Sequence, residues 1–204
     1  MPKVLVVYDS VSGASEDVGR AVAEALVKRG WKASVRKAGE FSEKGGSLEG
    51  FDAVVVGCPL WLGRTTFSMR RFLRASREAL AARPLALFFT CLTIPVEEGL
   101  AAPTIPVFID PTLSGVDRSP GWLNFYEYFH TPHYAVKRFR KRYPELRPES
   151  VAFFNGRLDF SRLSFLRKAF MLVEMFMLED IKEGDFVNRK SAALWVKNLF
   201  TGMG

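Results

Sequence analysis

The chain has 204 residues, of which 48% are hydrophobic and 25% are charged, a composition that predicts an ordinary packed core. No run of 18 apolar residues is present, so we expect no transmembrane helix, and Met1-Pro2-Lys3 leads into a strand rather than a signal peptide. Two cysteines are too few for a disulfide framework, which makes the cytoplasm the default location. The net charge of +7 indicates an acidic partner: nucleic acid, anionic lipid or an anionic substrate.

Strand and helix patterns alternate along the first 90 residues. Short apolar or alternating runs predict strands at 4–8, 32–37, 53–56 and 85–89. Apolar residues at helical spacing predict helices over 16–29 and 65–80. The polar, glycine-rich residues 39–50 predict a loop.

The alternation of strand and helix patterns ends in the second half of the chain. Residues 92–133 contain six prolines, yet an aromatic cluster from Trp122 to Phe129 argues against disorder. We expect residues 94–130 to fold over the strand ends near Trp61, or against a second subunit. After it, the sequence predicts a basic helix at 134–142, a fifth strand at 151–154, an apolar helix at 164–179 and a last helix capped by Asn188.

A turn crowded with hydroxyls follows the first strand, and the chain is organised around it. Ser10, Val11, Ser12, Gly13, Ala14 and Ser15 form the pattern S-x-S-G-x-S between a strand and a helix. Helix N-terminal N–H groups and serine hydroxyls bind phosphate, and glycine allows close backbone approach. The loop carries no lysine or arginine, so it fits a monophosphate better than a nucleoside triphosphate. An ordinary serine-rich turn with a helix cap is the alternative.

This pattern resembles the phosphate loop of flavodoxins, which implies FMN as cofactor. Together with the alternating elements it predicts an α/β, flavodoxin-like doubly wound sheet of five parallel strands, in the order 2-1-3-4-5, with helices on both faces. We expect a single domain over 1–204, with a Pro-rich insertion at about 94–130 and an apolar helical insertion at about 158–185.

Ligands of such sheets lie outside the carboxyl ends of the strands. The third and fourth strands are followed by two loops that bracket the flavin ring in flavodoxins, and Trp61 stands where an aromatic ring often stacks on it. A tryptophan packed on the following helix is the alternative. The predicted cofactor-binding residues of these loops are Pro59, Leu60, Trp61, Leu62, Gly63, Thr90, Cys91, Leu92 and Thr93.

A narrower resemblance covers about residues 3–93 and 131–200. The pair Gly57 and Gly63, the Arg-rich helix, the run 151–158 and the final Trp-bearing helix resemble the flavodoxin-fold protoporphyrinogen IX dehydrogenases of bacteria. This resemblance implies an FMN enzyme that oxidises a small molecule, a porphyrinogen, and passes electrons to a quinone. The stretch 94–130 is longer than expected for that family. The alternatives are an electron-transfer flavodoxin without its own substrate, and a binding module that has lost FMN.

Other constellations point to no further chemistry. The basic run 137–142 has no accompanying nucleic-acid motif, so we expect no nucleic-acid partner. His130 and His133 lack the neighbours of a metal site or a catalytic triad, and no catalytic residue is predicted. Cys58 and Cys91 end adjacent strands, which leaves either a redox pair or two small buried thiols.

The helix over 164–178 is apolar nearly all round, so it must be buried somewhere. It is too short to span a bilayer, which takes about 20 apolar residues. We expect peripheral contact with the inner face of the cell membrane, where a quinone would be met, while the alternatives are a cover for the sheet or the seam of a homodimer. Its apolar residues are Phe165, Leu166, Phe170, Met171, Leu172, Val173, Met175, Phe176, Met177 and Leu178.

Overall fold

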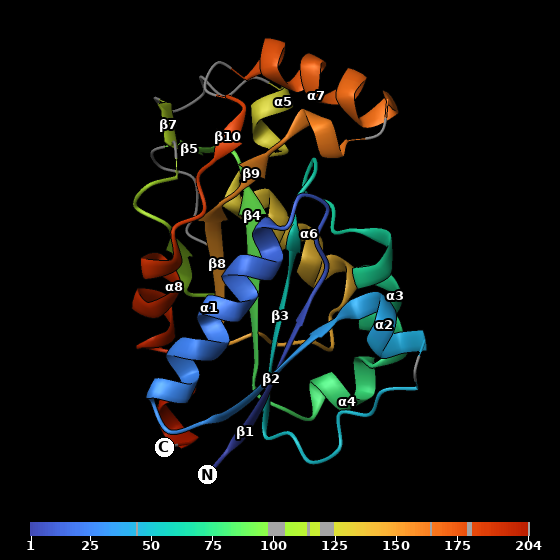
Figure 1. The fold of residues 1–204 in the computed structure, drawn as a ribbon, viewed down its shortest axis with the longest axis vertical. Coiled ribbons are helices and arrows are strands. Elements are labelled where there is room, and N and C mark those ends of the chain that lie inside the picture. Colours follow the sequence, from blue (N-terminus) through green and yellow to red (C-terminus); the bar gives the residue numbers. More distant parts are fainter. Residues whose placement is uncertain are drawn as a thin grey trace.

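The computed structural model describes residues 1–43, 45–97, 105–113, 115–118, 125–163, 165–178 and 181–203. A parallel sheet occupies its centre, with helices on both faces (Figure 1). The strands of this sheet are β1 (Lys3–Tyr8), β2 (Lys32–Lys37), β3 (Ala53–Pro59), β4 (Leu85–Cys91), β6 (Val107–Ile109) and β8 (Ser150–Asn155). The helices beside it are α1 (Ala14–Lys28), α2 (Ala38–Glu43), α3 (Phe67–Ala75), α4 (Arg77–Ala81), α6 (Pro132–Arg142) and α8 (Arg189–Val196).

The strand order is β2-β1-β3-β4-β8-β6, and every pair is parallel. The first five strands confirm the predicted order, but the predicted number of strands is wrong. Residues 107–109 form a sixth strand at the edge, where Val107 pairs with Val151 and Ile109 with Phe153. Three residues within a Pro-rich stretch give no periodic signal, and the strand exists because β8 offers an unpaired edge.

Alternate residues of the strands feed two separate cores, as the side-chain direction of a strand requires. Val4 and Val6 of β1 face α1 and α8, whereas Leu5 and Val7 face α3, α4 and α6. All four side chains are fully buried. The sheet is therefore covered on both faces, which explains why its strands are continuous apolar runs.

The structure corrects the predicted segment 39–50, which is not entirely a loop. Helix α2 forms there because Phe41 packs edge-on against Phe72 of α3, with ring centroids 5.7 Å apart. The predicted helix over 65–80 is divided at Ser76, which ends α3 and precedes α4. Both departures depend on packing or backbone geometry that local periodicity does not reveal.

The insertions lie around the carboxyl edge of the sheet. Helix α7 (Phe165–Met177) and the short α5 (Phe125–Tyr128) lie across the top of the molecule in Figure 1, beyond the strand ends. Two small pairs accompany them: β5 (Ile94–Glu97) with β7 (Gly115–Arg118), and β9 (Arg157–Leu158) with β10 (Gly184–Asp185). Trp122 and the side chain of Tyr126, from the predicted aromatic cluster, lie outside the described residues.

No helix among the described residues is both long enough and apolar enough to cross a membrane. The longest apolar helix, α7, has 13 residues. At about 1.5 Å per residue it would cover only part of a hydrocarbon core about 30 Å thick.

Gly57 in β3 leaves the space that the ring of Phe88 fills. A Cβ atom at Gly57 would lie 1.9 Å from Phe88 Cζ, and Phe88 is held in turn by Phe154 and Trp195. We predict that Gly57→Ala lowers the free energy of unfolding by about 3 kcal/mol, the upper end for an overpacked core. Urea denaturation followed by circular dichroism measures this.

Gly39→Ala is the matched control, since no heavy atom lies within 4 Å of its added Cβ and Gly39 lies in α2. Alanine favours a helix over glycine by up to about 1 kcal/mol, so this variant should be as stable as the natural chain or slightly more so. Equal stability of the two variants would contradict the packing around Gly57.

Candidate functional site

The serine-rich turn joins β1 to α1 at the carboxyl edge of the sheet. Gly13 has a left-handed backbone conformation, with φ of 92°, which a side chain would strain. Its N–H donates to Ser10 Oγ over 3.0 Å, and no side chain caps the helix that begins at Ala14. The first N–H groups of α1 are therefore arranged to receive an anion such as a phosphate.

Two serines tie this turn to other parts of the edge. Ser12 Oγ donates to the carbonyl of Arg157 over 2.9 Å. Ser15 is buried, and its Oγ lies 2.7 Å from Oγ1 of Thr90, at the end of β4. The turn is thus braced on both sides, which reduces the ordering that binding would require.

Arg157 brings a cation to a turn whose own residues carry none. Its guanidinium donates to the Ser12 carbonyl over 3.1 Å, to Asp17 over 2.8 Å and to Asp185 over 2.5 Å. Burial alone would raise the pKa of the Asp185 carboxyl, but hydrogen bonds from Arg157 and the Val187 N–H hold it below its ordinary value. Arg157 is therefore fixed beside the turn, although 145 residues separate it from Ser12.

The three predicted loops meet around a narrow enclosed slot. Its walls include ten predicted residues: Val11, Ser12, Ala14, Pro59, Leu60, Trp61, Thr90, Cys91, Leu92 and Thr93. The slot has a volume of about 60 Å³, whereas sites for cofactors commonly have about 300–1,000 Å³. The slot is therefore narrower than the usual site of a cofactor.

Five predicted residues lie beside the slot rather than in its walls. Ser10, Gly13 and Ser15 shape the serine turn. Leu62 and Gly63 both have positive φ, of 47° and 64°, and they turn the chain away from the slot. Leu62 lines a neighbouring cavity. Gly63 is buried, and a Cβ atom added to it would lie 2.5 Å from the ring of Tyr134.

Sequence reasoning missed the residues that close the slot. Gly156, Arg157 and Leu158 follow β8, so the rule that ligands lie beyond strand ends applies to them equally. The remainder come from the insertions and carry no local signal. They are His130, Leu163, Met171, Glu174 and Ile181.

Helix α7 is the main cover of the slot. Met171 and Leu178 are buried against Leu158 and Leu163. Near the middle of the helix, Glu174 Oε1 lies 3.4 Å from Nε2 of His130, and both side chains are at most 10% exposed. This buried polar contact joins the cover to the segment that follows α5.

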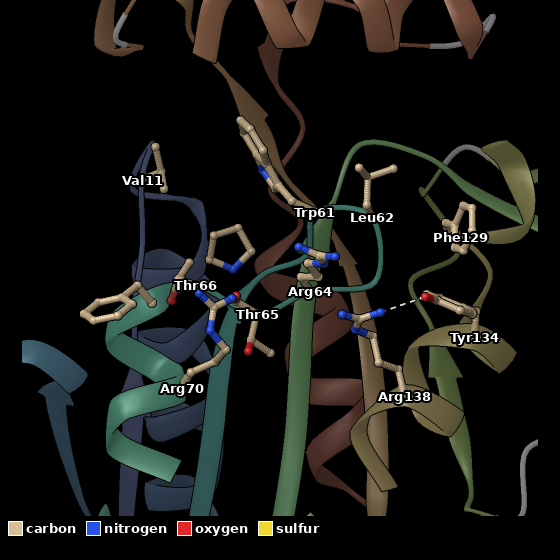
Figure 2. Close-up of a pocket in the computed structure, with 12 residues that line it drawn as sticks. Val11, Trp61, Leu62, Arg64, Thr65, Thr66, Arg70, Phe129, Tyr134 and Arg138 are labelled. Carbon is tan, nitrogen blue, oxygen red and sulfur yellow. Dashed lines mark hydrogen bonds between the residues drawn. The ribbon is translucent and has the colours of Figure 1, made fainter. Parts of the chain in front are cut away.

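A larger cavity of about 530 Å³ adjoins the slot and shares Val11, Pro59 and Trp61 with it. Trp61 and Leu62 form its upper part, Phe129 and Tyr134 come from the insertion and α6, and Arg64, Arg70 and Arg138 converge below them (Figure 2). Arg138 donates to Tyr134 Oη over 2.8 Å. The cavity therefore combines aromatic walls with three cationic groups, as a site for an anionic aromatic ligand would.

The two cysteines have the properties of packed thiols. Both are free, and Cys58 is buried among the side chains between the sheet and α3. Burial raises the pKa of each thiol to about 12, so the thiolate is scarce at neutral pH. This favours the interpretation as small buried thiols over the redox pair.

Metal chemistry finds no support among the described residues, where no three histidine, cysteine, aspartate or glutamate side chains gather to hold an ion. His130 contacts Glu174 as described above. The donor set of the edge, with backbone N–H groups, hydroxyls and one arginine, instead suits a phosphate ester.

A family model described as a flavodoxin domain matches residues 5–185 of the chain. The chain belongs to the flavodoxin domain family. The match spans the serine turn, the loops after β3 and β4 and both insertions, so the site described above lies within the flavodoxin domain.

Several solved flavodoxins resemble the chain at low identity. Flavodoxin 2 of Bacillus cereus is 16% identical, with a TM-score of 0.44, over 87% of this chain and 99% of that one. A short-chain flavodoxin associated with a bacterial microcompartment is 14% identical, with a TM-score of 0.46, over 86% and 99%. The C101A mutant of flavodoxin from Pseudomonas aeruginosa is 19% identical, with a TM-score of 0.41, over 95% and 99%. The family assignment rests on the domain match and not on these scores.

The bracing by Arg157 leads to a prediction about cofactor affinity. Arg157→Met removes the contacts to the Ser12 carbonyl, Asp17 and Asp185, and it should weaken FMN binding about tenfold, a loss of about 1.4 kcal/mol. Quenching of FMN fluorescence in titrations of the flavin-stripped protein measures the affinity.

Arg189→Met is the control, because Arg189 also contacts Asp17, over 3.1 Å, but is largely exposed and shows no hydrogen bond to the serine turn among the described residues. Its FMN affinity should stay within about twofold of the natural chain, since exposed ion pairs contribute little. Equal losses in both variants would contradict a specific role of Arg157.

Proposed function

We propose that this flavodoxin-family protein is an FMN-dependent oxidoreductase of the protoporphyrinogen IX dehydrogenase type, with a quinone as electron acceptor. The observation that carries the proposal is the cavity of about 530 Å³ beside the slot, with which it shares Trp61. A flavodoxin that only exchanges electrons with other proteins needs no cavity of its own for a small molecule. A chain that oxidises a substrate needs one next to the flavin.

FMN is the cofactor that the flavodoxin domain indicates, and the residues of the site fit it. The serine turn and the N-terminus of α1 would hold the phosphate, braced by Arg157. Trp61 and the segment 90–93 would hold the ring between them. When bound, FMN accepts a hydride or single electrons, while the protein supplies orientation and shields the ring from water.

Contact with a membrane belongs to the same proposal, because a quinone acceptor resides there. The outer side of α7 is apolar and exposed: Phe165 is 84% and Phe176 is 87% accessible, and Leu172 and Val173 are also exposed. Phe125 of the neighbouring α5 is 81% accessible as well. This face would dip into the headgroup region at the inner side of the cell membrane.

The two sides of α7 have different surroundings. One side of α7 packs over the slot through Met171, Glu174 and Leu178, so the helix is partly a cover. The other side remains open to a membrane or to a second copy of the chain. The side chains of Leu166, Phe170 and Met177 lie outside the described residues.

The function is tested by supplying substrate to the FMN-loaded protein without oxygen. We predict that protoporphyrinogen IX bleaches the flavin absorbance near 450 nm, about the usual wavelength of oxidised flavins, and that a menaquinone analogue restores it. Gly13→Asp should abolish FMN binding. The new carboxylate would repel the phosphate, and a side chain would strain the left-handed backbone of this residue.

Two outcomes would contradict the proposal. A protein that binds FMN but is not reduced by protoporphyrinogen, while it accepts electrons from a flavodoxin reductase, is an electron-transfer flavodoxin. A protein that takes up no flavin under any reconstitution is a binding module. FMN binding by Gly13→Asp as tight as in the natural chain would refute the assigned phosphate position.

Membrane contact is tested by co-sedimentation with vesicles of phosphatidylglycerol and phosphatidylethanolamine. We predict that the natural chain sediments with the vesicles and that Phe165→Ser with Phe176→Ser reduces binding at least about tenfold, since each buried aromatic contributes about 1.5–3 kcal/mol. Val27→Ser with Leu194→Ser removes exposed apolar side chains from α1 and α8 instead and should leave binding unchanged. Absence of vesicle binding together with dimers that the α7 variant dissociates would make this face a homodimer seam.

A further inference from the structure

A groove lined by arginines runs between α3 and α6, away from the flavin slot. We call it the arginine groove, and its volume is about 680 Å³. Leu60, Ala135 and Phe139 contribute apolar surface to its walls. Its six arginines are Arg64, Arg70, Arg71, Arg74, Arg138 and Arg142.

The helical repeat arranges these arginines in two rows. Arg70 and Arg74 are four residues apart on α3, and Arg138 and Arg142 are four apart on α6. Four residues advance a helix by about 6 Å, so each wall presents two cations on one side of its helix about one turn apart. A ligand in the groove would meet cations from both sides at two levels.

The charges of the groove are not neutralised within the described part of the chain. No aspartate or glutamate lines the groove, and none of its six arginines forms an ion pair with a described residue. Arg70 instead donates to the Thr65 carbonyl over 2.7 Å, and Arg138 donates to Tyr134 Oη. A bound anion would balance the positive charge that these arginines bring to the groove.

The groove continues into the aromatic cavity beside the slot. Arg64, Thr65, Phe67, Arg70 and Arg138 line both spaces. Figure 2 shows Arg64 between Arg70 on α3 and Arg138 on α6, beneath Trp61 and Leu62. The two spaces therefore form one composite site, apolar and aromatic toward the flavin slot and cationic away from it.

We propose that this composite site binds a small, flat ring system that carries at least two carboxylate groups. The ring would lie in the aromatic cavity beside the flavin, and the carboxylates would extend into the arginine groove. There a guanidinium group can donate two parallel hydrogen bonds to one carboxylate. The inference rests on the proposed function for its choice of ring, a porphyrin. It adds which residues select the substrate by its acid groups and hold it in one orientation.

The shape of the site favours a small ligand over a protein or a membrane. Both spaces are concave, with volumes in the range of about 300–1,000 Å³ that is typical of small-molecule sites. The arginines face one another across the groove from two helices, whereas the apolar face proposed for membrane contact lies on α7. A flat anionic surface would reach the outer arginines but not the partly buried Arg70 and Arg138.

The test is equilibrium binding of protoporphyrin IX, which has two carboxylates, and of its uncharged dimethyl ester, both dissolved in the same non-ionic detergent. Porphyrin fluorescence is titrated with the FMN-loaded protein. We expect saturable binding of the diacid that weakens as sodium chloride is raised, and at least about tenfold weaker binding of the ester. Arg74→Glu with Arg142→Glu should weaken binding of the diacid at least about tenfold.

Arg36→Glu with Arg147→Glu is the matched control, because both residues are exposed, lie outside the groove and change the net charge equally. It should bind the diacid within about twofold of the natural chain. Arg74→Gln with Arg142→Gln provides a milder variant, and FMN content together with the melting temperature reports whether each variant is folded.

Equal binding of diacid and ester, or equal losses in the groove and control variants, would overturn the proposal. Two further results distinguish binding in the groove from the dehydrogenase activity. Arginine-dependent binding of the diacid without reduction of FMN by protoporphyrinogen would support the groove and refute the dehydrogenase. Reduction of FMN by protoporphyrinogen that is as fast and as saturable in the groove variant as in the control would retain the dehydrogenase and refute the groove.

Discussion

Parallel pairing of buried strands is the constraint on which the rest of this structure depends. Tyr8 lies beside Gly57, Gly57 beside Phe88, and Phe88 beside Ala152, so β1, β3, β4 and β8 advance together. Because they run in one direction, their four following loops must emerge at one edge. The serine turn, the Trp61 loop, the segment 90–93 and Arg157 meet for this reason, and the hydrogen bonds of Ser12 and Ser15 then hold three of them together.

The insertions lie at that edge and shape the site from outside the sheet. Helix α7 covers the slot with one side and leaves its apolar other side exposed. The contact between His130 and Glu174, whose side chains are at most 10% exposed, joins this cover to the other insertion.

The positive charge of the chain is used in two different ways. Arg157 is surrounded by acceptors and therefore acts as a brace, since its charge is balanced by Asp17 and Asp185. The arginines between α3 and α6 have no such partners among the described residues, and their charge is directed into a groove. By our proposals, the same residue type braces the turn that holds the phosphate and selects the ligand at the opposite end of the site.

The sequence by itself determined the five long strands and the serine turn between β1 and α1, because burial on both faces and turn chemistry leave local patterns. The order of these strands followed from the resemblance to flavodoxins, and the structure confirms it. Tertiary structure alone decided the sixth strand and α2, since Val107 needs the edge of β8 and Phe41 needs the ring of Phe72. It also decided the position of Arg157, which lies far along the chain from the turn it braces. Each arginine row resembles an ordinary solvated helix face in the sequence, and the rows face each other only because α3 and α6 pack side by side on one sheet.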